Sequence, residues 1–395
     1  MPGSPAARDL RPLIVFVDLG MMLSFDQLAS RLRRQDVEVA HLTVAHNPLA
    51  RLISRAAYDR TELWADPSDL PGLFARLGAD RIVDVQCPEA LLDDVATAAR
   101  QASLPPATIA LLAHRQSWQD KQITSQHLAE AGIPVPRTHP ASGAELEYLA
   151  AAVGMPLVLK ATVSSGGEGV RVVSAPDEFQ PALEFLSSQG GTVYAEQYLP
   201  GSTSCWAAVL SDGAVLDSAI YRTLQSRQSE GASSSIDVVE DSTVSAIGAR
   251  VAQVIGGAGM VNLDLVRDAS GDPFVVDVNL RAWHSVVALS AVGHDFTTAY
   301  LASLGLASAP VVDARLGPVH VFPDQNGSEL AISRRRGARR FAHDLWGQRS
   351  VLPARYLAVQ TLLFARRLLD ARPRGGACSA DDRGSGRMGR APVGA

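Results

Sequence analysis

Cysteine and charge are both scarce in this sequence of 395 residues. Three cysteines, Cys87, Cys205 and Cys378, lie far apart and form no CxxC pair. We therefore expect neither a disulfide scaffold nor a cysteine-built zinc site, and a reducing cytosol fits. Charged residues make up 19% of the chain and hydrophobic residues 47%, which excludes a mainly disordered protein. The net charge of −5 gives no reason to expect nucleic acid as a partner.

Long hydrophobic runs are also lacking. No segment reaches the roughly 18 uninterrupted apolar residues that a membrane-spanning helix needs. The apolar run 13–17 is short and Asp18 ends it, so no secretory signal is expected. These absences favour a cytoplasmic protein, and a chain of this length has room for two or three domains.

Lysine is rarer still, because only Lys121 and Lys160 are lysine among 36 basic residues. Drift in an arginine-rich genome explains such a bias without any function. However, a site that needs a compact ammonium beside a phosphate would resist replacement by the wide, planar guanidinium of arginine. The surroundings of the two lysines are therefore the first place to look for chemistry.

Strands alternate with helices in the N-terminal part of the chain. Hydrophobic patterns predict strands at 13–18, 37–44 and 79–86, and helices at 24–34 and 88–102. This alternation indicates a parallel α/β sheet covered on both faces. The first strand ends in Asp18-Leu19-Gly20 rather than GxGxxG, so the Rossmann-type layer lacks the dinucleotide fingerprint. Leu104-Pro105-Pro106 is expected to close this region.

The middle of the chain mixes strands and helices in a different order. Helices are predicted at 118–131, 145–153, 179–188 and 243–255, and single strands at 135–139, 156–162, 170–173 and 192–199. Two hairpins follow, 206–210 with 214–221 and 260–266 with 273–280.

The second hairpin places acidic and amide side chains opposite one another. A turn centred between Ser270 and Gly271 would pair residues whose numbers sum to 541, so that Asp264 faces Asp277 and Asn262 faces Asn279. Opposed carboxylates repel, and a cation between them would remove the repulsion. Oxygen ligands of this kind suit magnesium. A solvated sheet face with a slipped register is an equally weighted interpretation.

Two further segments are weak signals by themselves. Gly166, Gly167 and Gly169 in the loop 164–169 would let backbone N–H groups turn toward an anion, directly after the strand that holds Lys160. The strand ending at Glu196-Gln197-Tyr198-Leu199 stops before Pro200-Gly201 and leaves backbone groups free to contact a purine edge.

The order of these segments resembles the ATP-grasp superfamily of carboxylate ligases, in its carbamoyl-phosphate-synthase-like and biotin-carboxylase-like branch. The resemblance covers about residues 117–306, with a weaker match to a pre-ATP-grasp layer over 12–110. It rests on Asp120-Lys121, PLVLKATVSSGGEGV (156–170), YAEQYLPG (194–201), NLDLV (262–266) and VVDVNLR (275–281). Both lysines of the chain fall on the two lysine positions of the family.

The resemblance implies a fold and its boundaries. We expect a Rossmann-like pre-ATP-grasp domain over 1–115 and a two-lobed α+β ATP-grasp domain over 116–310, with its small lobe at about 135–198. A basic helical extension over 311–374 and a disordered tail over 375–395 would follow. Dimerisation is expected by analogy alone.

The resemblance also implies residue roles. The ATP site would comprise Lys121, Lys160, Ser165, Gly166, Gly167, Gly169, Glu196, Gln197, Tyr198 and Leu199. Asp264, Asp277 and Asn279 would hold Mg²⁺, with Mn²⁺ as a substitute. Lys160 and Arg281 would be catalytic, with Arg281 stabilising an acylphosphate. Arg222 and His284 are candidate substrate residues, although Arg222 could lie in a solvated loop and a lone histidine is more often structural.

The implied activity joins a small carboxylate to an amine through an acylphosphate and releases ADP and phosphate. A carrier-protein thiol is a variant acceptor. Three departures from the family bear on ribose contacts and on metal binding. Asp277 stands where glutamate is usual, Thr203 where a ribose-binding glutamate is frequent, and Ala282-Trp283-His284-Ser285 where relatives often have small residues and glycine. Kinase-like phosphotransfer to a small molecule, or a nucleotide-binding scaffold without turnover, are the alternatives.

The C-terminal region is strongly basic. From 331 to 374, eleven arginines stand against two aspartates, and a helix is predicted over 351–369. Three interpretations are open: a helix packed on its own domain or on a second subunit, a helix lying on an anionic membrane surface, or, least favoured, a nucleic-acid contact.

Overall fold

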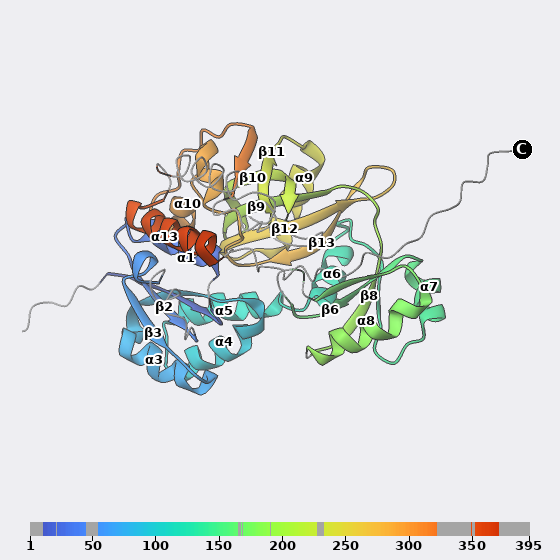
Figure 1. Ribbon diagram of the computed structural model, residues 1–395, viewed down its shortest axis with the longest axis horizontal. Helices are drawn as coiled ribbons and strands as arrows, with labels where there is room; N and C mark the ends of the chain where they lie inside the picture. The colour runs from blue at the N-terminus through green and yellow to red at the C-terminus, as the bar shows by residue number, and fades with distance from the viewer. Residues whose placement is uncertain are drawn as a thin grey trace, which may run out of the picture.

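The computed structural model describes residues 11–20, 22–44, 54–164, 167, 169–189, 191–226, 233–321, 349 and 352–370. Three sheets organise these residues (Figure 1). The expected disordered tail at 375–395 and much of the basic extension lie outside the described residues, as do the loop residues Ser165 and Gly166.

The first sheet is the predicted parallel layer, with strand order β3-β2-β1-β4. Its strands are β1 (Leu13–Asp18), β2 (Glu38–Thr43), β3 (Arg60–Leu63) and β4 (Ile82–Gln86), and its helices are α1 (Leu23–Leu32), α3 (Leu70–Leu77), α4 (Leu92–Gln101) and α5 (Pro106–Ser117). Every side chain of β1 is buried because helices cover both faces. Strand β3 was not predicted, because its RTEL sequence is too short and polar to show a strand pattern.

The proline pair 105–106 does not close this layer, which corrects the sequence interpretation. Pro106 instead opens α5, because proline lacks an N–H that the first helical turn does not need. The helix packs against α4 and β4. It therefore leads the chain from the first layer directly toward Lys121.

The second sheet forms a small lobe and has the strand order β5-β8-β6-β7. It comprises β5 (Thr138–Pro140), β6 (Leu157–Ala161), β7 (Val170–Val173) and β8 (Val193–Gln197). Helices α7 (Leu146–Val153) and α8 (Pro176–Ser188) cover one face, where Leu157, Leu159 and Ala195 are buried. Because strand side chains alternate, Lys160 and Glu196 lie on the opposite face.

The third sheet has six strands in the order β13-β12-β9-β10-β11-β14. They are β9 (Thr203–Ser211), β10 (Ala214–Ser226), β11 (Ser233–Val238), β12 (Gly259–Arg267), β13 (Pro273–Asn279) and β14 (Gly317–His320). Helices α6 (Lys121–Glu130) and α9 (Ser242–Ile255) pack on one face, through Leu128 and Val244 among others. Both hairpins were predicted from the sequence, whereas β11 and β14 were not.

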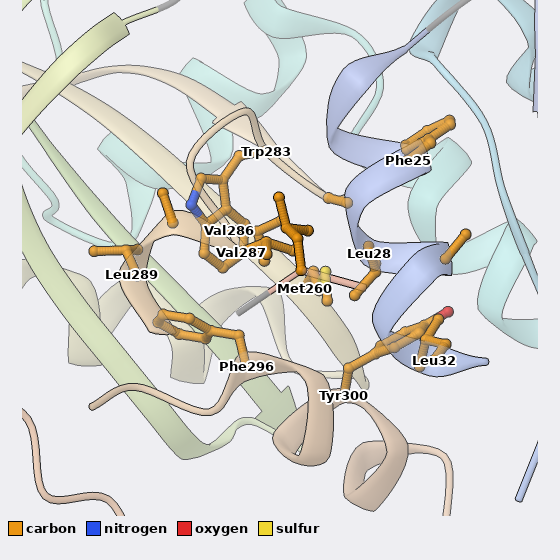
Figure 2. Packing of buried hydrophobic residues seen from close by; sticks show 14 of the residues in the cluster. Phe25, Leu28, Leu32, Met260, Trp283, Val286, Val287, Leu289, Phe296 and Tyr300 are labelled. Atoms are coloured by element: carbon orange, nitrogen blue, oxygen red, sulfur yellow. The ribbon is translucent and has the colours of Figure 1, made fainter. Parts of the chain in front are cut away.

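The other face of this sheet joins the first layer in one hydrophobic cluster (Figure 2). Helix α1 contributes Phe25 and Leu28, and α10 (Phe296–Ser303) contributes Phe296 and Tyr300. The two domains therefore share a core, which holds the carboxyl end of β4 close to the segment that follows β13.

The C-terminal helix α13 (Ala354–Asp370) packs on the same cluster through Tyr356 and Leu357. This contact agrees with the interpretation that the basic helix packs on its own chain. Among the helices that the structure describes, none has the length and apolar character needed to cross a membrane.

Candidate active site

Two carboxylates oppose each other on the edge hairpin, as predicted. Asp264 on β12 pairs with Asp277 on β13, and Asn262 pairs with Asn279. The register shifts between Asp264 and Leu265, because Leu265 pairs with Val275 and leaves Val276 as one extra residue. This β-bulge, a feature frequent beside active sites, went unpredicted. It lets Val275 and Val278 both face the core while Asp277 faces Asp264.

The two carboxylates have different surroundings. Asp264 accepts hydrogen bonds from Cys205 Sγ at 3.2 Å and Asn262 Nδ2 at 3.2 Å, while burial and the nearby Asp277 raise its pKa. Burial would also raise the pKa of Asp277, but the Lys121 ammonium, together with Lys160 and the backbone N–H of Val278, holds that pKa below its usual range. Asp277 is therefore the more strongly ionised member of the pair.

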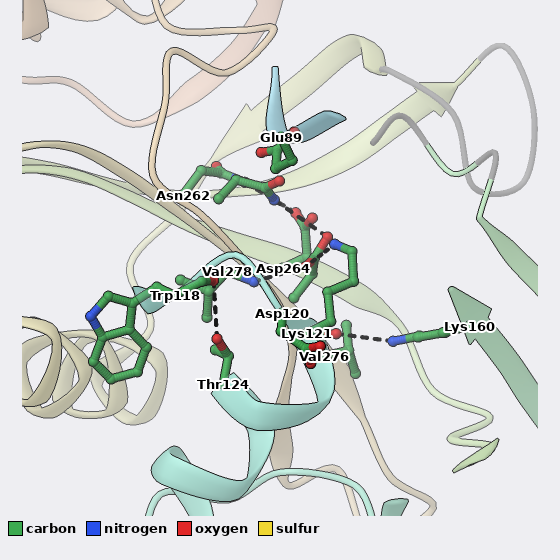
Figure 3. Close-up of polar contacts among 12 residues, drawn as sticks. Glu89, Trp118, Asp120, Lys121, Thr124, Lys160, Asn262, Asp264, Val276 and Val278 are labelled. Carbon is green, nitrogen blue, oxygen red and sulfur yellow. Dashed lines mark hydrogen bonds and ion pairs between the residues drawn. The ribbon is translucent and has the colours of Figure 1, made fainter. Parts of the chain in front are cut away.

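Lys121, which Figure 3 shows at the start of α6, reaches Asp277. The helix begins at Lys121, not at Trp118 as predicted, because the Asp120 side chain caps it by accepting from the backbone N–H groups of Gln122 and Ile123, each at 2.9 Å. The backbone N–H of Lys121 donates to Thr162 O at 2.9 Å, at the end of β6. This backbone hydrogen bond therefore holds the two lysine-bearing segments together, independently of the lysine side chains.

Lys160 connects the small lobe to the bulge. Its Nζ lies 2.6 Å from Glu196 Oε1. The same Nζ donates to Val276 O at 2.9 Å, as Figure 3 shows. Burial raises the pKa of Glu196, and the paired ammonium opposes that shift. Glu196 was predicted as a nucleotide residue, and in the structure its carboxylate holds Lys160 in place.

Arg281 follows β13 and contacts a residue that sequence analysis missed. Its Nε lies 2.8 and 2.9 Å from the two carboxylate oxygens of Glu89, just beyond β4. Its Nη2 donates to Asn279 Oδ1 at 3.4 Å, beside the carboxylate pair. Ligand sites of open α/β sheets lie beyond the carboxyl ends of the strands, and that rule was the available signal for Glu89.

The other predicted nucleotide residues lie around the small-lobe sheet. Gly167 and Gly169 follow β6, and a Cβ on Gly169 would lie 2.2 Å from Ser164 Oγ, so only glycine fits there. Gln197 ends β8, and its backbone N–H donates to Arg137 O at 2.9 Å. Tyr198 is partly exposed and Leu199 is buried beyond it.

The structure places the two candidate substrate residues in different surroundings. Arg222 is not brought to the carboxylate pair: Tyr221 donates to Asn262 Oδ1 at 3.0 Å, so its neighbour Arg222 faces the other side of the sheet. There the half-exposed guanidinium lies 3.9 Å from Asp241, the cap residue of α9. His284 lies three residues after Arg281, and burial lowers its pKa to about 4, so the imidazole is neutral at pH 7.

The carboxylate and amide oxygens on the hairpin determine which cation it could bind. Within the described ranges, no three His, Cys, Asp or Glu side chains gather closely enough to bind a metal ion by themselves. Asp264, Asp277 and Asn279 instead offer two carboxylates and an amide oxygen on one sheet face. This hard, incomplete donor set fits Mg²⁺, which takes its remaining ligands from water and substrate phosphates.

Comparisons with known proteins match the same part of the chain. Residues 118–285 match the family model described as an ATP-grasp domain. A curated relative, the biotin carboxylase of a Nostoc species, is 29% identical over 180 residues. That match covers 41% of this chain and 40% of the relative, so the chain spans less than half the length of that protein.

Solved structures extend the likeness to the fold of most of the chain. An L-amino acid ligase from Bacillus licheniformis aligns with a TM-score of 0.58, 16% identity and 74% coverage of each chain. The biotin carboxylase domain dimer of the Hydrogenobacter thermophilus 2-oxoglutarate carboxylase, in complex with MgADP, ADP and bicarbonate, aligns with a TM-score of 0.59 and 15% identity. That alignment covers 78% of this chain and 72% of the other.

Proposed function

We propose that the protein is an ATP-dependent ligase, on the premise that residues 118–285, which match the ATP-grasp family model, act as an ATP-grasp domain. It would join a small carboxylate to an amine through an acylphosphate and release ADP and phosphate. The single observation that carries the proposal is the convergence of both lysines on the paired carboxylates. Lys121 reaches Asp277, and Lys160 reaches the bulge one residue away.

The chain's own residues account for phosphate binding. Lys121 at the start of α6 and Lys160 on β6 supply two ammonium groups. Each would exchange its acidic partner, Asp277 or Glu196, for phosphate oxygens when ATP binds. Asp264, Asp277 and Asn279 would hold Mg²⁺, whose charge neutralises phosphate oxygens when it is bound. The MgADP complex of the carboxylase neighbour supports this choice of cation and nucleotide.

Arg281 is the group best placed to act on the reacting carboxylate. It lies next to Asn279 and its guanidinium carries hydrogen-bond donors beyond those used by Glu89. Such a group stabilises negative charge that develops on an acylphosphate and on the tetrahedral intermediate formed when an amine attacks. The enzyme would act by positioning and charge neutralisation, and no nucleophilic side chain is required.

Calorimetric titration of MgATP tests the site first. Wild-type protein should bind MgATP saturably, and Asp277→Asn should weaken binding roughly tenfold or more, because it removes a charged ligand. Asp272→Asn is the matched control, since Asp272 is exposed at the turn of the same hairpin. Equal binding by wild type and Asp277→Asn would overturn the assignment of the nucleotide site.

A substrate screen then tests the reaction. Carboxylates, with bicarbonate and α-amino acids included because the neighbours' names suggest them, are paired with amines, and ADP and free phosphate are measured. ADP and phosphate released in equal amounts only when both substrates are present support a ligase. A phosphorylated product without free phosphate would indicate a kinase, and binding without turnover a scaffold.

A further inference from the structure

A buried polar network joins the first domain to the segment that carries Arg281. Asp84 and Gln86 come from β4, Arg115 from α5 and Tyr300 from α10, and all four side chains are buried. Gln86 Nε2 donates to Asp84 Oδ2 at 2.7 Å and to the Tyr300 hydroxyl at 3.3 Å. Arg115 Nη2 donates to Asp84 Oδ2 at 2.9 Å, and Tyr300 donates a further hydrogen bond to Asp84.

This network leaves one oxygen directed at the active-site segment. Gln86 Oε1 accepts a hydrogen bond from the backbone N–H of Ala282 at 3.3 Å. Ala282 is completely buried and follows Arg281 directly. Three residues beyond Gln86, Glu89 holds the guanidinium of Arg281. The end of β4 thus holds both the backbone and the side chain of the Arg281 segment.

Stability alone does not explain why so many polar groups are buried here. A buried ion pair such as Asp84 with Arg115 must overcome the loss of solvation of both charges, and well-packed apolar residues often serve stability as well. Burial by itself would raise the pKa of Asp84, and Arg115 holds it below the usual range, so Asp84 is an ionised acceptor. Charged and directional contacts instead fix one geometry for the groups they hold.

We infer that Gln86, oriented by Asp84 and Tyr300, is a positioning residue that sets the location of Arg281 relative to the carboxylate pair. The inference rests on the proposed function, because it gives Arg281 its role in the reaction. Gln86 touches no reacting group, and it acts through Ala282.

Two conservative variants test the inference. Tyr300→Phe removes only the hydroxyl, and Gln86→Met keeps the side-chain length while removing all three hydrogen bonds of the amide group. Tyr356→Phe is the matched control, because Tyr356 is equally buried and its hydroxyl lies near Asp26, Gln27 and Gln360, outside the network of Asp84, Gln86, Arg115 and Tyr300. Thermal unfolding of all three variants shows whether each protein is folded.

The first readout needs no substrate. In nitrogen-15 NMR spectra the Arg281 Nε–H resonance is identified as the signal missing from Arg281→Lys. We expect that resonance to shift or broaden in Gln86→Met and Tyr300→Phe and to stay unchanged in Tyr356→Phe. An unshifted resonance in folded Gln86→Met overturns the inference, whatever the protein catalyses.

The second readout is turnover. With a substrate pair from the screen, both network variants should lower kcat by about tenfold to a hundredfold, the cost of a small misplacement. Their KM for MgATP should stay within about twofold, because neither lysine is touched. Equal changes in kcat and in KM for MgATP would indicate general loosening and refute positioning. Absence of wild-type ADP release with every pair would refute the proposed function, and the NMR result would still decide the geometry.

Discussion

At the scale of single residues, each lysine in the site has an acidic partner. Lys160 and Glu196 are both almost fully buried, with 8% and 4% of their side chains exposed, whereas Asp277 beside Lys121 is 24% exposed. Breaking the two pairs is therefore expected to cost different amounts of stability. Removing one member of a buried pair leaves a charge without a partner, which is far more costly than the same change at an exposed pair.

Lys160→Met should accordingly abolish ADP formation and also destabilise the fold by about 3–5 kcal/mol, the typical cost of breaking a buried pair. Chemical denaturation measures the loss. The double variant Lys160→Met with Glu196→Gln removes the stranded charge, so it should recover most of the stability and none of the activity. Full turnover by either variant would contradict the phosphate-binding role of Lys160.

At the scale of elements, two packing contacts can be tested by single changes, one between a helix and a strand and one between two helices. The first is the packing of α9 on β9, where Gly248 lies against Trp206. A Cβ on Gly248 would lie 2.3 Å from the indole ring, closer than any real contact allows. The second is the contact of α1 with α13, where Asp26 is buried near Tyr58 and Tyr356.

Gly248→Ala should lower the free energy of unfolding by about 1–3 kcal/mol, because the extra methyl group overpacks the contact. Gly72→Ala in α3 is the control: its Cβ would meet only the end of the Arg76 side chain at 3.7 Å. That helical replacement should stabilise the protein by about 0.5–1 kcal/mol. Urea denaturation distinguishes the two directions, and equal effects would contradict the packing.

Asp26 makes stability depend on pH. Burial raises its pKa from 3.8 to about 7, so the folded state retains a proton that the unfolded state has lost between these values. Its contribution is therefore fully present below about pH 4, falls as pH rises toward 7, and is gone above that. Asp26→Asn should flatten this decline and be more stable than wild type at pH 8. Parallel pH profiles of the two proteins would contradict the shift.

At the scale of the whole molecule, the C-terminal helix belongs to the shared core. Tyr356→Ala should destabilise the protein by about 3–5 kcal/mol, since it leaves a cavity where a fully buried aromatic ring joined α13 to α1. Tyr356→Phe should cost far less than Tyr356→Ala, because it keeps the buried ring and leaves no comparable cavity. If Tyr356→Ala unfolds at the same temperature as wild type, α13 does not stabilise the core.

Sequence patterns predicted most of this arrangement. They failed for features that leave no mark in the local sequence. The Asp264–Asp277 register followed from turn residues and strand periodicity, which are local signals. The bulge at Val276 did not, because an extra residue leaves no mark in an apolar run. Glu89 was missed for a different reason: its role arises only when β4 and β13, almost 200 positions apart in the chain, are brought together.

The contacts from β4 to the Arg281 segment have a consequence for how such a protein can change over evolutionary time. Related genes can exchange whole domains and so acquire new substrate ranges. Such exchange is simplest when no functional contact crosses the domain boundary. Here Gln86 and Glu89 lie on one side of that boundary, and Arg281 and Tyr300 on the other. A chimera that inherits a foreign first layer would have to inherit these partners with it, so the two domains must diverge together.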